Sequence, residues 1–202
     1  MKNNLFILSI AMLIFSSCSK QIEKGESDTS TKKGAETVSK NYIQYTIPKG
    51  EQYCDKSIFV PVKCSQLSFK VKFDSSAIYK TSSETNQTDI NKLYGFSDNN
   101  AAHHEYSARF GWRWSDNALR LFAYDYNNSV MSFKELGTVQ IGAENTCSIK
   151  VSGNEYIFSL NGAETKMPRA STTILAEGYK LFPYFGGNES APHTISIWIE
   201  EL

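Results

Sequence analysis

The sequence predicts an all-β domain, a sandwich or barrel of antiparallel strands. Two observations predict it: short runs alternate apolar and polar residues, and turn residues separate these runs at regular intervals. A third is that no run keeps a helical apolar period for longer than about two turns. We expect about ten to twelve strands, which is typical of a sandwich or barrel. They cover residues 42–47, 57–62, 66–73, 93–96, 107–114, 118–127, 136–141, 146–152, 156–160, a short piece near Thr165, 179–185 and 194–200.

The central element is a hairpin over residues 107–127, with a turn at Ser115-Asp116-Asn117. Successive side chains of a strand point to opposite faces. One face is apolar and is expected in the core: Phe110, Trp112, Trp114, Leu119, Leu121 and Ala123. The other face combines cations with aromatic rings: Arg109, Gly111, Arg113, Arg120, Phe122, Tyr124 and Tyr126. This second face is the predicted ligand surface.

Two polar stretches interrupt the strand pattern. Residues 75–91 form a long excursion, and residues 99–106 form a loop that contains His103 and His104. Long segments without regular structure tend to be functional or mobile. His193 opens the last strand, and we expect it to fix a loop by a hydrogen bond.

The first 18 residues have the features of a targeting segment. Lys2 precedes an apolar run over residues 5–15, which is too short to span a bilayer and suits a signal peptide. The run ends at Cys18 in a pattern that resembles a bacterial lipobox, in which the cysteine is lipidated; an ordinary secretory signal is the alternative. Residues 19–40 are polar and are expected to form a disordered tether. We therefore expect export and a lipid anchor in the bacterial outer membrane, on either its periplasmic or its surface face.

Charge and cysteine content restrict the partners. Lys+Arg and Asp+Glu are 21 each, so no net positive charge favours nucleic acid. Exported chains meet oxidising conditions, and Cys54 and Cys64 could form a disulfide, with three free thiols as the alternative. Cys147 alternates with Ile149 and is expected to be buried. The cysteines lack metal-ligand spacing.

Two stretches carry a family resemblance. The strands from Leu136 through the Asn161-Gly162 turn resemble the paired hairpins of concanavalin A-like lectin and glucanase jelly rolls, and residues 179–199 resemble the closing strands of such domains in Bacteroidetes-type lipoproteins. The resemblance covers residues 41–202 and implies a jelly-roll β-sandwich of two antiparallel sheets. This superfamily contains glycoside hydrolases, polysaccharide lyases and sugar-binding modules, so the fold does not choose the activity.

No catalytic motif stands out. The E-x-D-x-E motif of retaining glucanases is absent, and so are the R-x-E-L-R and Q-I-H motifs of alginate lyases. The primary hypothesis is therefore an anchored carbohydrate-binding lipoprotein that recognises a polysaccharide or oligosaccharide on its concave sheet face. A lyase or hydrolase of the same fold and a non-catalytic envelope assembly protein remain open alternatives.

The predicted ligand-binding residues are Arg109, Arg113, Arg120, Tyr124, Tyr126, His103, Tyr184 and Trp198. Aromatic rings stack on sugars, and arginine binds carboxylates in a bidentate manner. No catalytic residue or metal ligand is assigned and no cofactor is expected, apart from a weak indication of structural calcium at residues 186–189. The membrane is expected to be contacted only through the lipid anchor.

Overall fold

A computed structural model of the protein describes residues 41–202. The predicted signal peptide, the lipidation site Cys18 and the tether over residues 19–40 lie outside this range. Twelve strands are present in the described residues, together with two short 3₁₀ helices, η1 (Ser75–Ala77) and η2 (Glu84–Thr88). None of the helices described there is long and apolar enough to cross a membrane. The all-β prediction is confirmed.

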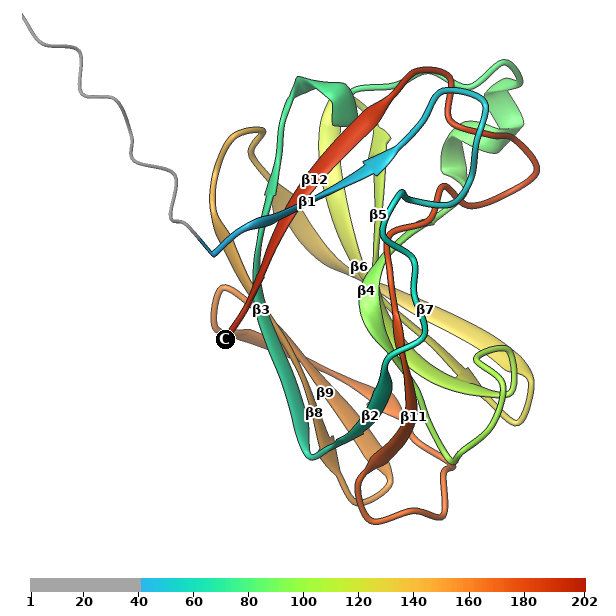
Figure 1. The fold of residues 1–202 in the computed structure, drawn as a ribbon, viewed down its shortest axis with the longest axis vertical. Helices are drawn as coiled ribbons and strands as arrows, with labels where there is room; N and C mark the ends of the chain where they lie inside the picture. Colours follow the sequence, from blue (N-terminus) through green and yellow to red (C-terminus); the bar gives the residue numbers. More distant parts are fainter. Residues whose placement is uncertain (1–40) are drawn as a thin grey trace, which may run out of the picture. The chain divides into compact units, whose positions relative to one another are not determined.

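The strands form two six-stranded antiparallel sheets that face each other (Figure 1). The first sheet has the order β1 (Ile43–Ile47), β12 (Ile195–Glu201), β3 (Gln66–Phe73), β8 (Asn145–Ser152), β9 (Glu155–Leu160) and β10 (Ala163–Pro168). The second sheet has the order β2 (Pro61–Cys64), β11 (Ala176–Leu181), β4 (Asn91–Ser97), β5 (Tyr106–Ser115), β6 (Ala118–Asn127) and β7 (Val130–Val139).

The core fills the space between the sheets. Strand β3 shows how the sequence dictates it, because Leu67, Phe69, Val71 and Phe73 alternate with polar residues and all four are buried. Their rings meet those of the facing sheet: the centroids of Phe69 and Phe110 lie 5.5 Å apart, and Phe110 also contacts Phe158. Cys147 is buried here as predicted.

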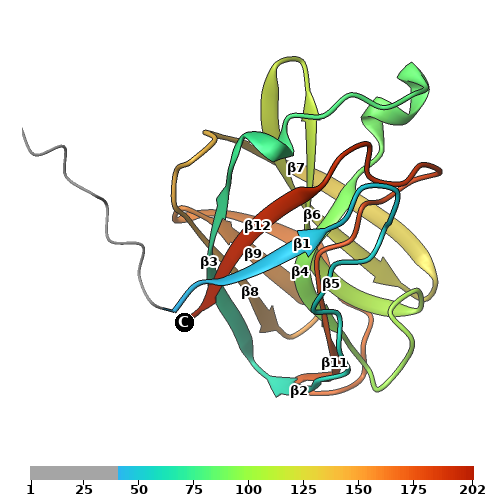
Figure 2. The same ribbon diagram turned by 45° about the horizontal axis from the view of Figure 1, so that its top comes forward.

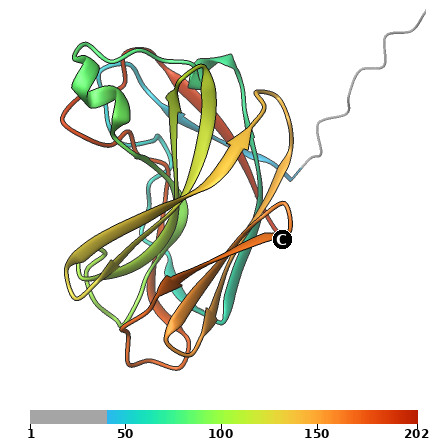
Figure 3. The same ribbon diagram turned by 180° about the vertical axis from the view of Figure 1, so that it is seen from behind.

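The central hairpin forms with the predicted faces. Strands β5 and β6 pair in a single register from Tyr106–Asn127 to Ser115–Ala118. Asp116 and Asn117 both have positive φ, as the two central residues of a tight hairpin turn require. Its apolar face enters the core and its cation-bearing face lies on the outer side of the second sheet. The hairpin continues into β7, so β5, β6 and β7 form a meander (Figure 3).

Three strands differ from the prediction. β7 begins at Val130 rather than near residue 136, β2 begins at Pro61 rather than at 57, and β11 covers Ala176–Leu181 rather than 179–185. Both β2 and β7 are edge strands with exposed side chains, so they lack the one-sided apolar pattern on which strand prediction depends.

The possible Cys54–Cys64 disulfide is absent, and Cys54, Cys64 and Cys147 are free thiols in the structure, as in the alternative. The edge topology gives the reason. Tyr53 pairs with Tyr184, whereas Cys64 pairs with Ala176, so the two cysteines lie about eight residues apart along the neighbouring chain. At about 3.3 Å per residue this separation is roughly 26 Å, far beyond the reach of a disulfide.

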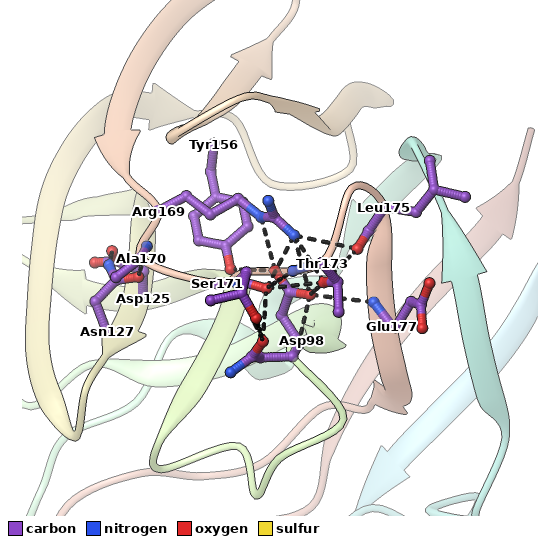
Figure 4. Close-up of polar contacts among 12 residues, drawn as sticks. Asp98, Asp125, Asn127, Tyr156, Arg169, Ala170, Ser171, Thr173, Leu175 and Glu177 are labelled. Atoms are coloured by element: carbon purple, nitrogen blue, oxygen red, sulfur yellow. Dashed lines mark hydrogen bonds and ion pairs between the residues drawn. The ribbon is translucent and has the colours of Figure 1, made fainter.

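A buried ion pair fastens the end of the sandwich where β4 ends (Figure 4). Asp98 is fully buried and accepts a 2.8 Å hydrogen bond from Nε of Arg169 and a 2.7 Å bond from the hydroxyl of Tyr156. Burial alone would raise the pKa of Asp98, but these donors outweigh it and lower the pKa. Arg169 also donates to the carbonyl of Leu175, so the pair holds the loop between β10 and β11.

Candidate functional site

The site is built on one row of residues across the outer face of the second sheet. Tyr53 pairs with Tyr184, Tyr184 with Lys92, and Lys92 with Gly111. Directly paired residues place their side chains on the same face. The hairpin register therefore adds Arg109 and Tyr124 to this face, one row away.

These side chains surround a pocket of about 600 Å³, a size suited to a small ligand or a segment of a larger one. The pocket is lined by Tyr53, Ser57, Ile58, Phe59, Lys92, His103, His104, Arg109, Tyr124, Tyr126, Tyr179, Lys180, Leu181, Phe182, Pro183, Tyr184, Gly186 and Gly187. Among these described lining residues there is no Asp or Glu.

Two cations line the pocket side by side, Arg109 buried and Lys92 partly buried. The guanidinium of Arg109 and the amine of Lys92 both lie over the ring of Tyr124, at 5.5 Å and 4.4 Å from its centroid. Within the described residues neither cation forms an ion pair with a carboxylate. Nε of Arg109 is buried without a hydrogen-bond partner there. Such an arrangement is costly for the free protein and suits an anionic ligand.

Burial shifts the pKa values of both cations downward. Burial, followed by the charge of Arg109, lowers the pKa of Lys92 to about 8, while Asp89 opposes the shift. Burial also lowers the pKa of Arg109 to about 10, against the opposing effect of Tyr124 and other phenols. Arg109 is therefore charged at neutral pH, and Lys92 is close to its titration range.

Histidines and tyrosines form one wall of the pocket. The hydroxyl of Tyr179 accepts a 3.1 Å hydrogen bond from the backbone N–H of His103 and lies 2.9 Å from its Nδ1. His103 stacks on His104, which in turn meets the ring of Tyr126. Burial, followed by the charge of Arg109, lowers the pKa of His103 to about 4, so His103 is neutral at physiological pH.

The opposite wall is the chain from Tyr184 to Gly187, which Gln52 holds in place. The hydroxyl of Tyr184 donates a 2.7 Å hydrogen bond to Oε1 of Gln52, while Nε2 of Gln52 donates to the carbonyl oxygens of Gly187 and Glu189. Gly187 has a φ of +84°, and a Cβ there would lie 1.9 Å from Oδ2 of Asp89. A glycine is thus required at this position.

The segment between β3 and β4 is latched to the same wall. The carboxylate of Glu189 accepts hydrogen bonds of 2.8 Å and 2.9 Å from the backbone N–H groups of Ser82 and Ser83, and one from the side chain of Asn86. Figure 2 shows η2 beside the loop that precedes β12. His193 lies 2.8 Å from the carbonyl oxygen of Ser76, which confirms its predicted role in fixing a loop.

Five of the eight predicted ligand-binding residues line this pocket: His103, Arg109, Tyr124, Tyr126 and Tyr184. Tyr124 is almost buried rather than exposed, because the two cations cover its ring.

The other three predicted residues lie elsewhere. Arg113 is on the same sheet face but donates to the carbonyl of Thr88 beneath the 75–91 segment, which covers that part of the sheet. Arg120 forms ion pairs with Glu135 and Asp116. Trp198 belongs to β12 of the other sheet and lines a separate hollow, so its inclusion in the predicted surface is wrong.

Sequence reasoning missed several lining residues, above all Lys92 and Tyr179. Lys92 could have been found by beginning the strand one residue before Leu93, because Leu93 is buried and its neighbour must face outward. Tyr179 had no local signal, since its place beside His103 depends on the pairing of β11 with β2 and β4.

The described residues contain no group of three or more His, Cys, Asp or Glu that could hold a metal ion. At residues 186–189, the candidate calcium site, the carboxylate of Glu189 accepts hydrogen bonds from the three N–H donors of the latch.

No known family model matches the sequence, and no curated protein matches it. Solved structures do resemble the fold. The alginate lyase AlyC3 superposes with a TM-score of 0.59 at 11% identity, over 80% of this chain and 74% of that one. Its complex with dimannuronate gives 0.57 at 13% identity, over 80% and 73%. The endo-1,3-β-glucanase (laminarinase) domain from Thermotoga petrophila gives 0.52 at 10% identity, over 81% and 77%.

The fold is a concanavalin A-like jelly roll. The predicted fold class is thereby confirmed. Identities this low carry the fold and not the activity, so the function of this jelly roll must be argued from the pocket itself.

Proposed function

We propose that the pocket binds an anionic polysaccharide and that Lys92 and Arg109 hold a carboxylate of one sugar unit. The observation that carries this proposal is the pair of adjacent cations, Arg109 buried and Lys92 partly buried, neither of which has a carboxylate partner in the described residues. An arriving carboxylate would supply the acceptors that Arg109 lacks, in the bidentate geometry that arginine favours. The solved neighbour in complex with dimannuronate, an acidic disaccharide, supports the same ligand class.

Aromatic rings around the cations suit the apolar faces of sugar rings. Tyr53 and Phe59 are exposed at one end of the pocket. Beyond Tyr124 and Tyr126, their cross-strand partners Phe133 and Met131 on β7 share the same face and are half-exposed. These side chains offer stacking surfaces to further units of a chain that crosses the sheet.

A binding panel tests this proposal. Polyuronates and neutral glucans are compared by affinity electrophoresis, with the variants Lys92→Met and Arg109→Met. Lys180→Met is the matched control, because Lys180 also lines the pocket but is paired with Glu201. We expect retardation by polyuronates only, lost in the first two variants and kept in the control. Equal retardation by neutral glucans would reject the proposal.

A second candidate function is cleavage of the same ligand. The absence of acidic residues among the described lining groups argues against hydrolysis by a carboxylate pair. Elimination at a uronate needs a cation at the carboxylate, a base and a proton donor. The pocket contains cations, phenols and the neutral imidazole of His103, and this set of groups favours a lyase over a hydrolase.

We also propose that Cys18 anchors the protein in the bacterial outer membrane through a lipid, with the jelly roll outside the cytoplasm. The sequence pattern around Cys18 supports this proposal. Metabolic labelling with a fatty acid should mark the wild type and leave Cys18→Ala unlabelled. Equal labelling of both would contradict the assignment.

A further inference from the structure

Lys92 occupies an unusual position for a lysine. Its Nζ donates a hydrogen bond to the carbonyl oxygen of Ile90, whose side chain packs over Gly111. A Cβ at Gly186 would lie 3.1 Å from the same nitrogen, so a glycine there leaves the amine accessible from the pocket. The charged and titratable groups around it are Arg109 on β5, Tyr124 on β6, Tyr184 after β11 and Asp89 before β4.

Four neighbouring groups, His103, Arg109, Tyr124 and Tyr184, are less suited to accept a proton. His103 faces the hydroxyl of Tyr179 with Nδ1, and burial lowers its pKa to about 4, which makes it a weak base. Arg109 remains protonated at neutral pH. The phenols of Tyr124 and Tyr184 have raised pKa values, chiefly because of burial, so they are proton donors rather than bases.

An amine beside a second cation in a desolvated site is the arrangement that activates lysine. A base works best when its pKa lies near the working pH. Burial, chiefly, lowers the pKa of Lys92 to about 8. An exposed lysine, with its ordinary pKa of about 10.4, would be almost fully protonated at pH 8.

We infer that Lys92 is the catalytic base of a β-elimination in this pocket, removing the C5 proton of a bound uronate. This inference rests on the proposed binding of an anionic polysaccharide. Lys92 acts in this step as the neutral amine, so Arg109 alone holds the C6 carboxylate, where negative charge develops as the proton leaves.

The reaction balances without water or a redox partner. The electron pair of the C5–H bond forms the C4=C5 double bond, and the bond from C4 to the glycosidic oxygen breaks. The departing oxygen takes a proton from the phenol of Tyr184, the cross-strand neighbour of Lys92, whose hydroxyl turns from Oε1 of Gln52 to the substrate for this step. Lys92 then returns its proton through solvent, and Tyr184 is reprotonated. One fragment carries the unsaturated uronate and the other carries a new hydroxyl end.

The test follows the absorbance of the unsaturated product, with polymannuronate, polyguluronate and polygalacturonate as substrates for the full chain. Lys92→Arg keeps a cation in the pocket but removes the base at neutral pH. We expect its kcat to fall about 100-fold or more while the Kd for the same polymer changes less than about threefold. Lys63→Arg is the matched control and should retain wild-type kcat, because Lys63 is not among the pocket-lining residues and is paired with Glu177.

Two further readouts separate a base from a structural residue. The wild-type kcat should rise with pH through a single ionisation near 8, and this ionisation should be lost in Lys92→Arg. Added primary amines should restore part of the activity of Lys92→Ala.

A Lys92→Arg variant that retains wild-type kcat would overturn the assignment. Binding of all three polymers without any unsaturated product would also overturn it, and would leave the proposed binding function intact. Absence of binding to any polyuronate would instead reject the proposed function itself.

Discussion

Replacement of Lys92 by methionine should make the protein more stable at neutral pH. The folded-state pKa of Lys92 is about 8, compared with 10.5 for the free side chain. A shift of this size corresponds to about 3 kcal/mol of destabilisation of the protonated form, at about 1.4 kcal/mol per pKa unit. Met has a similar length without charge, and loss of the hydrogen bond to the carbonyl of Ile90 offsets about 1 kcal/mol. We expect a net gain of about 2 kcal/mol, a rise in Tm of roughly 4–8 °C.

The sign of the pH dependence provides a second check. Because the folded pKa lies below the unfolded one, the folded state binds this proton more weakly. The full penalty is therefore present below pH 8 and disappears as pH rises from about 8 to 10.5, where the native state loses the proton first. The Tm difference between Lys92→Met and wild type should shrink over this range.

Differential scanning calorimetry at pH 7 and pH 10 measures both effects, with Lys180→Met as the control for loss of a paired lysine. A variant that is less stable than wild type at pH 7, or a Tm difference that does not change with pH, would refute the reasoning that the cation is held at a cost to stability.

Two other predictions concern the elements that support the site. Arg169→Met leaves Asp98 buried without its partner and should lower the free energy of unfolding by about 3–5 kcal/mol. Lys166→Met breaks an exposed pair with Glu155 and should change the free energy of unfolding by less than about 1 kcal/mol. Urea titration measures both variants, and similar values for the two would contradict the buried-pair account. Hydrogen bonds from the backbone N–H groups of Ser82 and Ser83 lower the pKa of Glu189, so its carboxylate holds this segment. Glu189→Ala should therefore speed amide hydrogen exchange at Ser82 and Ser83 several-fold, with little change at β5. Unchanged exchange at these two residues would show that the latch is not closed in solution.

The fold and the centre of the site could be predicted from the sequence because both depend on the alternation of apolar and polar residues within single strands. The β5–β6 hairpin shows this, since its parity and its turn placed Arg109, Tyr124 and Tyr126 on one outer face, where the structure has them. Trp198 shows the limit: parity puts it on an outer face, but only the topology reveals that the face belongs to the other sheet. Edge strands such as β7 have no buried apolar face, so their bounds cannot be predicted from apolar alternation.

Long-range pairing decided the rest of the site. Arg113 has the same parity as Arg109, yet the 75–91 segment folds back over it and its guanidinium donates to Thr88. Lys92 joins the site only because β4 pairs with β5 and meets Tyr184. These contacts link residues distant in the chain, and no local pattern encodes them.

The central claim is that two adjacent cations without a carboxylate partner in the described residues, Arg109 and Lys92, select a carboxylate. Isothermal titration calorimetry with one oligouronate and with its carboxyl-reduced counterpart, a neutral chain of the same length and linkage, tests it most directly. If Lys92 and Arg109 each contribute about 1.5–3 kcal/mol through charge-assisted hydrogen bonds, reduction should weaken binding about 100-fold or more. Arg109→Met should then keep only the part of the preference that Lys92 supplies, about tenfold at the lower estimate. Equal affinity of the wild type for the two chains would contradict the account.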